Sequence, residues 1–155
     1  MIVRLALLVA VAGLVSCIQA DVAAARGNSC DGLSPHSAQI ACRDRVAAGS
    51  RARMLRALDA NRRNARALDA EYGADFKDAA TDGRSGFLDR LNASQAAWDK
   101  YAKAQCDYES GKSFGGSGGW DLLALCADRL NRQRLAELGA MLAADRARDA
   151  APAKR

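Results

Sequence analysis

Apolar and small residues recur at alternating spacings of three and four in three long segments, which is the pattern of one face of an α-helix. In the segment that begins near Ser37, this face carries Met54, Leu58, Asn61, Ala65, Leu68 and Tyr72. In the next segment it carries Leu88, Leu91, Gln95, Trp98, Ala102 and Gln105. In the last it carries Leu123, Ala127, Leu130, Arg134, Leu138 and Met141. No stretch alternates at the period of two that a strand shows, so the pattern predicts an all-α protein.

Glycine-containing stretches interrupt or separate these segments. Gly49-Ser50 is expected to break or kink the first helix. A turn signal covers 81–86, and the second helix should run to about Glu109. Five glycines then lie between 110 and 119, before a third helix that starts near Trp120. Because short connections join neighbouring helices, we expect a small antiparallel three- or four-helix arrangement.

The first 20 residues have the character of an export signal. Arg4 is their only charge, and the eleven residues 5–15 are uncharged and too few to span a bilayer, which needs about 20. The sequence LVSC follows and resembles the lipobox of bacterial lipoproteins, which predicts cleavage after 16 and lipidation of Cys17. Cleavage after Ala20 to give a secreted protein, and an uncleaved anchor, are the alternatives.

The expected organisation follows from the first of these cuts. We expect a lipoprotein-type signal peptide over 1–16, a tether and entry loop over 17–36, a helical domain over 37–146 and a polar tail over 147–155. The expected location is the periplasm or the membrane surface of a bacterial envelope. Contact with the membrane would come through a lipid on Cys17.

The cysteines support export to an oxidising compartment. They are Cys17, Cys30, Cys42, Cys106 and Cys126. Four remain whether Cys17 is lipidated or removed, and none is spaced C-x-x-C, which argues against zinc or thioredoxin-type chemistry. Four cysteines predict two disulfides, with three possible pairings. Cys30–Cys42 with Cys106–Cys126 closes the shortest loops and is favoured, and each bridge would contribute about 3 kcal/mol.

Composition excludes more functions than it identifies. Only 5% of the 155 residues are aromatic and two are proline, whereas alanine, leucine and arginine dominate, which favours helices. His36 is the single histidine, so Ser117 has no histidine near it in sequence and a multi-histidine metal site is excluded. The chain also lacks a phosphate loop. We therefore expect no enzymatic activity, no metal and no cofactor.

Positive charge is concentrated in one stretch of the first predicted helix. Eight arginines lie between 43 and 66 and face only Asp44 and Asp59: Arg43, Arg45, Arg51, Arg53, Arg56, Arg62, Arg63 and Arg66. This excess of six exceeds the formal net charge of the whole chain, which is +5. The stretch is either a solvated face or a contact for an anionic envelope surface. Export argues against nucleic acid as the partner.

The pattern over 95–138 resembles the LprI-type lysozyme inhibitor family. The residues that carry this resemblance are Gln95, Trp98, Tyr101, Cys106, Glu109, Gly115, Gly116, Ser117, Cys126, Leu130, Arg134 and Leu138. Cys30 and Cys42 are similar to the family's N-terminal cysteine pair. The resemblance implies an exported helical disulfide domain and suggests a lysozyme or another muramidase as partner.

Polar residues on the apolar faces are expected to act as internal struts. At about 100° per residue, Arg134 falls between Leu130 and Leu138 on the third helix, and Gln95 lies within the arc of the second. A desolvated guanidinium needs a partner, and we expect Glu109 to supply it. Trp98 is expected in the core.

The Gly-rich segment from Asp107 to Gly119 is the best candidate for a binding surface. A disulfide would hold both of its ends, which lowers the cost of ordering a binding loop. Its candidate contact residues are Asp107, Tyr108, Glu109, Phe114, Gly115, Gly116 and Ser117. Such a loop could enter the carboxylate-lined cleft of a muramidase. Because a basic lysozyme would be repelled by a net charge of +5, the local acids Asp107, Glu109 and Asp121 would then favour contact.

Overall fold

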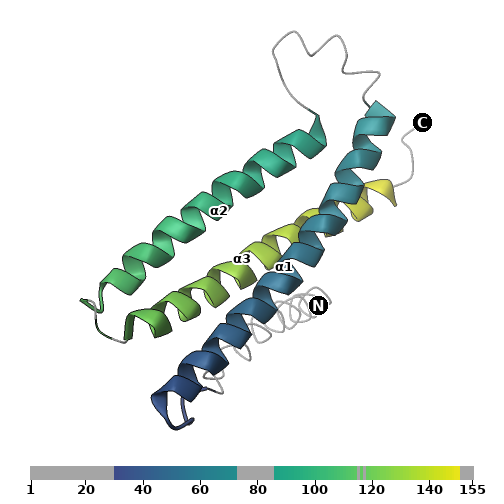
Figure 1. Ribbon diagram of the computed structural model, residues 1–155. Coiled ribbons are helices and arrows are strands. Elements are labelled where there is room, and N and C mark those ends of the chain that lie inside the picture. The colour runs from purple at the N-terminus through teal and green to yellow at the C-terminus, as the bar shows by residue number, and fades with distance from the viewer. Residues whose placement is uncertain (1–29, 73–85, 115, 117, 151–155) are drawn as a thin grey trace, which may run out of the picture.

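The computed structural model describes residues 30–72, 86–114, 116 and 118–150. They form three helices, α1 over His36–Tyr72, α2 over Phe87–Gly111 and α3 over Gly118–Asp149. Successive helices run in opposite directions, so the α2–α3 turn lies towards the end of the molecule at which α1 begins (Figure 1). No strand occurs in these ranges. The predicted all-α antiparallel arrangement is confirmed, with three helices rather than four.

Several boundaries differ from the sequence-based expectation. α2 continues two residues beyond Glu109, and α3 begins two residues before Trp120, so the connection between them covers only 112–117. α3 also runs to Asp149, three residues into the expected tail. The expected signal segment, Cys17, the tether before Cys30 and the last five residues lie outside the described residues.

The expected interruption of the first helix at Gly49-Ser50 was wrong. α1 is continuous through both residues. The Ser50 side chain is fully buried, and its Oγ donates a hydrogen bond of 2.9 Å to the carbonyl oxygen of Ala47, one turn earlier. Asn131 of α3 donates to the same Oγ at 3.3 Å. Because the hydroxyl is satisfied without leaving the helix, the chain has no reason to break there.

The core consists of two small clusters joined by a tryptophan. One lies where all three helices meet and contains Met54, Leu58, Ala65, Leu91 and Leu138. The other surrounds the α2–α3 disulfide and contains Cys106, Cys126 and Leu130. Trp98 is half-buried and packs against both, which agrees with its expected place in the core.

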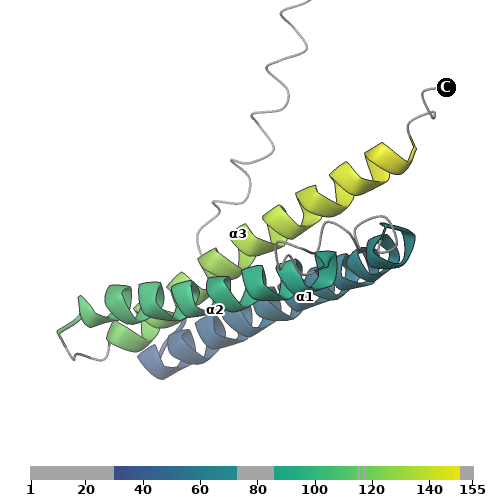
Figure 2. The same cartoon turned by 90° about the horizontal axis from the view of Figure 1, so that it is seen from above.

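The apolar face of α3 is shorter than its sequence pattern indicated. Leu138 is fully buried, but Met141 is 43% exposed. Towards its C-terminal end α3 diverges from α2 (Figure 2), whereas it stays joined to α1 through Asn64, which donates to Asp145 at 2.6 Å. The expectation that Met141 belongs to the packed face was wrong, because α2 diverges from α3 over these last turns.

The first turn of α2 is capped by a side chain from α1. Asp69 accepts hydrogen bonds from the backbone N–H groups of Phe87 at 2.6 Å and Leu88 at 3.1 Å. These N–H groups have no partner within their own helix, and a carboxylate there also complements the helix dipole. A Cβ at Gly86 would lie 2.7 Å from Asp69 Oδ1, so glycine is what allows this approach.

The stability of the core is expected to depend on a few aliphatic side chains. Leu58→Ala should lower the free energy of unfolding by about 2–5 kcal/mol, because it leaves a cavity where the three helices meet. Leu55→Ala is the matched control, since Leu55 lies on the same helix and is 39% exposed. It should cost less than about 1 kcal/mol. Equal losses in denaturant unfolding would contradict the assignment of the core.

Candidate functional site

Two disulfides and an ion cluster hold together one end of the bundle. Cys30–Cys42 ties the entry segment to α1, and Cys106–Cys126 ties the end of α2 to the start of α3, with Cα–Cα distances of 5.7 and 5.5 Å. Both predicted pairings are confirmed. This end of the molecule is called the clamped end below.

The ion cluster of the clamped end links α1 to α3. Arg43 lies 2.8 Å from Asp31 and 2.7 Å from Asp121, and the side chains of Arg43 and Asp121 are only 14% and 12% exposed. Hydrogen bonds to Asp31 and then to Asp121 raise the pKa of Arg43 above its ordinary value. His36 Nε2 approaches Asp121 at 3.5 Å. Asp121 is thus committed to an internal contact, so its carboxylate is not a free charge for a partner.

The α2–α3 turn is fixed by a series of hydrogen bonds three residues apart. The N–H groups of Ser113, Gly116 and Gly119 donate in turn to the carbonyl oxygens of Ser110, Ser113 and Gly116, at 3.2, 3.0 and 3.1 Å. A Cβ at Gly119 would lie 2.7 Å from Ser113 Oγ, so the start of α3 can approach the turn this closely only with glycine. These hydrogen bonds connect the described residues of the turn to the end of α2 and the start of α3.

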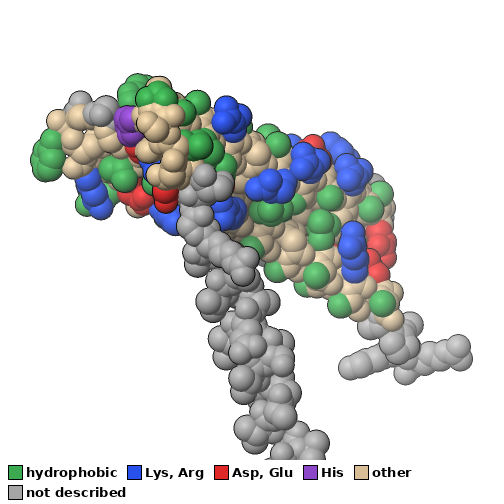
Figure 3. Space-filling view, turned by 90° about the horizontal axis from the view of Figure 1, so that it is seen from below, with side chains coloured by type: hydrophobic (Ala, Val, Ile, Leu, Met, Phe, Trp, Pro, Cys, Tyr) green, Lys and Arg blue, Asp and Glu red, His purple; other side chains and the backbone are tan. Residues whose placement is uncertain are grey.

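Aromatic side chains project from this turn and the helix ends beside it. Phe114 is 98% exposed, Trp120 67% and Tyr108 66%. Phe114 has a φ of 49°, a left-handed conformation that is strained for any residue with a side chain. Hydrophobic side chains gather at the left end of Figure 3, near the single histidine. Tyr108, Lys112, Phe114 and Trp120 are called the tip below.

Lys112 was missed from the sequence. Its Nζ lies 4.8 Å from the centre of the Tyr108 ring, a cation–π contact that keeps an ammonium group among the exposed aromatic rings. The spacing of four residues from Tyr108 within a helical segment was the signal that could have found it. Trp120, in the first turn of α3, is exposed as well.

The other predicted contact residues do not all lie in one loop. Asp107, Tyr108 and Glu109 belong to the last turns of α2 and not to a loop, because the helix continues to Gly111. Gly116 is exposed in the turn, whereas Gly115 and Ser117 lie outside the described residues. The turn thus brings Tyr108, Phe114 and Gly116 to one end of the molecule.

Both acids near the tip are already paired. Asp107 lies 2.5 Å from Lys103 Nζ. Glu109 Oε1 accepts hydrogen bonds from Gln105 at 2.7 Å and from Arg129 of α3 at 2.6 Å. The hydrogen bond from Gln105, followed by that from Arg129, holds the pKa of Glu109 below its ordinary value of 4.5. The local acids that were expected to meet a basic partner are therefore engaged within the protein.

Arg134 is buried as predicted, but its partners differ from the expected one. Its side chain is 8% exposed, and Nη1 lies 3.0 Å from Glu137. Nε donates to Gln95 Oε1 at 3.2 Å, and Nη2 donates to Ser94 at 3.1 Å. Glu109 is not among them, because it lies at the other end of α2, beside Arg129.

Gln95 and Tyr101 complete the residues that carry the family resemblance on α2. Gln95 is 4% exposed, and its Oε1 accepts a hydrogen bond from Arg134 Nε. Tyr101 is 53% exposed, so it adds an aromatic surface outside the core.

The arginines of 43–66 fall into two groups. Three of them, Arg43, Arg51 and Arg62, pair with acids within the protein. The other five are exposed and have no ion-pair partner in the described part of the chain: Arg45, Arg53, Arg56, Arg63 and Arg66. Much of the positive charge of α1 therefore remains open to a ligand.

Neither a metal site nor a membrane-spanning helix is found in the described residues. No group of three His, Cys, Asp or Glu side chains is placed to hold a metal ion there. None of the three helices combines the length and apolar character needed to cross a bilayer.

The profile of the family described as Lysozyme inhibitor LprI matches residues 40–138. The chain belongs to the LprI family. The match extends from the start of α1 to Leu138 of α3, so it includes the α2–α3 disulfide and the tip. No curated protein and no solved structure matches the chain.

The Glu109–Arg129 contact should stabilise the protein in a pH-dependent way. Because the pKa of folded Glu109 is lowered, its contribution is present above about pH 4.5 and is lost as pH falls through the folded pKa. Glu109→Gln should therefore lower Tm at about pH 7, and the difference from wild type should be smaller at about pH 3. A difference of the same size at both pH values would contradict this.

Arg134 and Gln95 should be energetically coupled. Arg134→Met and Gln95→Leu should each destabilise the protein by about 1–3 kcal/mol, because each leaves a buried polar group without its partner. The double variant should lose less free energy of unfolding than the two single variants lose together. The difference should be at least about 0.5 kcal/mol. Arg134→Met combined with Leu55→Ala, which shares no partner with Arg134, should be additive. Additivity in both pairs by denaturant unfolding would refute the coupling.

Proposed function

We propose that this protein is an exported, non-enzymatic binding protein that inhibits a muramidase by placing the tip in its substrate cleft. Membership of a family described as lysozyme inhibitors supports the class of function. The tip supports the mode of action, because it is the part of the described chain where large aromatic side chains are most exposed.

The observation that carries the proposal is the state of Phe114. An apolar ring that is 98% exposed gains nothing from folding, and its φ of 49° costs about 1–2 kcal/mol for a residue with a side chain. A strained and exposed ring is therefore unfavourable for stability alone. A partner that buries the ring offsets this cost, and aromatic residues are typical of the residues that dominate binding energy.

The shape and charge of the tip suit the cleft of a glycoside hydrolase. Such clefts are flanked by a pair of carboxyl groups. The tip offers Phe114 and Trp120 as apolar contacts, with the Lys112 ammonium beside Tyr108 as a cation for an acid. The acids near the tip, Asp107 and Glu109, are paired with Lys103 and Arg129. The hydrogen bonds of the turn and the Cys106–Cys126 bridge lower the entropy lost when the tip binds.

Export completes the proposed function. Two disulfides persist in oxidising compartments, where an inhibitor would meet a muramidase. The segment 1–16 serves as the signal peptide, and lipidation of Cys17 attaches the protein to the envelope, with secretion after Ala20 as the other form. The tether before Cys30 then separates the bundle from the membrane.

Inhibition should depend on Phe114 and not on a phenylalanine elsewhere. The purified, oxidised protein should abolish muramidase activity on cell-wall substrate at about one equivalent. Phe114→Ala should raise the concentration for half-inhibition about tenfold or more, as expected for a central aromatic contact. Phe87→Ala makes the same substitution at the opposite end of α2. It should change the concentration for half-inhibition by less than about twofold.

The outcomes show separately whether the protein inhibits a muramidase and whether the tip is responsible. Both variants should keep Tm within about 2 °C, so lost inhibition would not reflect unfolding. Inhibition should persist at high salt, because apolar burial is not screened. Failure of the wild type against several muramidase types would overturn the proposed function. Inhibition that both variants retain equally would overturn the role of the tip.

A further inference from the structure

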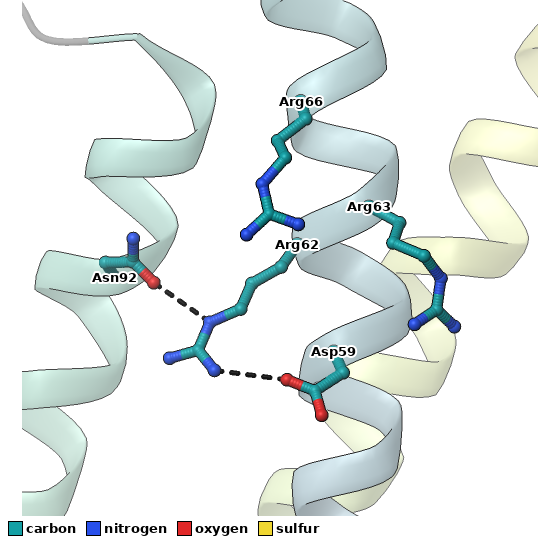
Figure 4. Close-up of a pocket in the computed structure, with 5 residues that line it drawn as sticks. All are labelled: Asp59, Arg62, Arg63, Arg66 and Asn92. Carbon is teal, nitrogen blue, oxygen red and sulfur yellow. Dashed lines mark hydrogen bonds and ion pairs between the residues drawn. The ribbon is translucent and has the colours of Figure 1, made fainter.

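An open groove between α1 and α2 is lined by cationic and polar side chains. It has a volume of about 600 Å³, and its lining residues are Asp59, Arg62, Arg63, Arg66 and Asn92. Asn92 comes from α2 and the others from α1. Arg62 and Arg66, one turn apart, point into the space between the two helices, and Arg63 leaves α1 on its other side (Figure 4). These five residues are called the arginine groove below.

The charges of the arginine groove are not balanced. Three arginines and one aspartate leave an excess of two positive charges. Asp59 pairs with Arg62 alone, at 3.2 Å, and Arg63 and Arg66 have no ion-pair or hydrogen-bond partner in the ranges that the structure describes. Cations one helical turn apart repel each other. An anion placed between Arg62 and Arg66 would relieve this repulsion.

The groove is also partly organised before any ligand arrives. Arg62 Nε donates to Asn92 Oδ1 at 3.0 Å, and Nη1 donates to Asp59 at 3.2 Å. These two bonds fix the plane of the guanidinium and leave its other N–H groups unused. The exposed Arg66 guanidinium supplies a second set of donors from one turn further along α1.

We propose that the arginine groove binds a phosphate group. The donors approach from two guanidinium planes, which suits an anion with three or more acceptor oxygens better than a planar carboxylate. The groove is open and its five lining side chains are all polar. It therefore binds a phosphate at the edge of the molecule rather than an enclosed apolar ligand. The phosphate is either free in solution or carried by a lipid headgroup.

The test compares two variants that remove the same charge from the same helix. Arg62→Gln with Arg66→Gln removes the two groove arginines that point between α1 and α2, and Arg53→Gln with Arg56→Gln removes two exposed arginines outside the groove. The probes are inorganic phosphate, vesicles of phosphatidylglycerol and vesicles of phosphatidylcholine. Binding is followed by the NMR signals of the arginine Nε–H groups and by vesicle sedimentation. The groove variant should lose affinity about tenfold or more, and the control less than about twofold.

The probes distinguish the two sources of phosphate. Saturable binding of inorganic phosphate that only the groove variant loses supports a site for free phosphate. Binding confined to phosphatidylglycerol vesicles, again lost only in the groove variant, supports a lipid headgroup. Equal losses in both variants would show adsorption by net charge and would overturn the site. Absence of binding to inorganic phosphate and to phosphatidylglycerol would also overturn it.

Further variants separate recognition by the guanidinium groups from the effects of lost charge and of unfolding. Arg62→Lys with Arg66→Lys keeps the charge but removes the planar donors, and should lose most of the affinity. Binding unchanged in this variant would overturn recognition by the guanidinium groups. If the double glutamine variant unfolds, Arg66→Gln alone is compared with Arg56→Gln, because neither arginine has a hydrogen-bond or ion-pair partner among the described residues.

Discussion

The covalent link between the end of α2 and the start of α3 is the constraint on which this architecture depends. The core contains few large side chains, and the fully buried ones are Met54, Leu58, Leu130 and Leu138. Burial of these side chains stabilises the fold by about 1.5–3 kcal/mol each, which is small against the cost of ordering three long helices. The Cys106–Cys126 bridge lowers that cost by restricting the unfolded chain, and it also brings the two helix ends into contact.

Polar contacts within the bundle then determine how the helices align. Asn61 of α1 donates to the backbone carbonyl oxygen of Leu138 at 3.0 Å, and Asn131 of α3 donates to that of Ala47 at 3.3 Å. Arg134 bonds Gln95 of α2. A shift of one helix along another would leave each of these buried groups without a partner. Alanine-rich surfaces alone would allow several alignments, so these contacts give the bundle its single register.

Periodicity and cysteine spacing predicted the fold because both are local properties of the chain. The apolar repeats located the three helices, and the shortest loops identified both disulfides. The failures concern information that a single segment does not contain. A helical wheel placed Arg134 on the inner face correctly, but it gave no position along the neighbouring helix, so Glu109 was assigned to the wrong arginine. The cap on α2 comes from Asp69, eighteen residues away, and had no local signal.

The candidate surfaces were predicted only in part for similar reasons. The glycines of 111–119 indicated a turn. They did not indicate that Phe114 would adopt a positive φ and remain exposed. The arginine count indicated an anionic partner, but the groove also needs Asn92 from another helix. Which arginines are free depends on acids such as Asp121 that fold against them, and this is set by tertiary structure.

The uninterrupted course of α2 has a geometric consequence. The helix runs without a break from Asn92, in the arginine groove, to Gly111, beside the tip. At about 1.5 Å per residue, these two points lie roughly 30 Å apart on a stiff rod. A macromolecule seated at one end would leave the other end uncovered. The molecule is thus built as a spacer of fixed reach, able to hold two different objects at a defined separation.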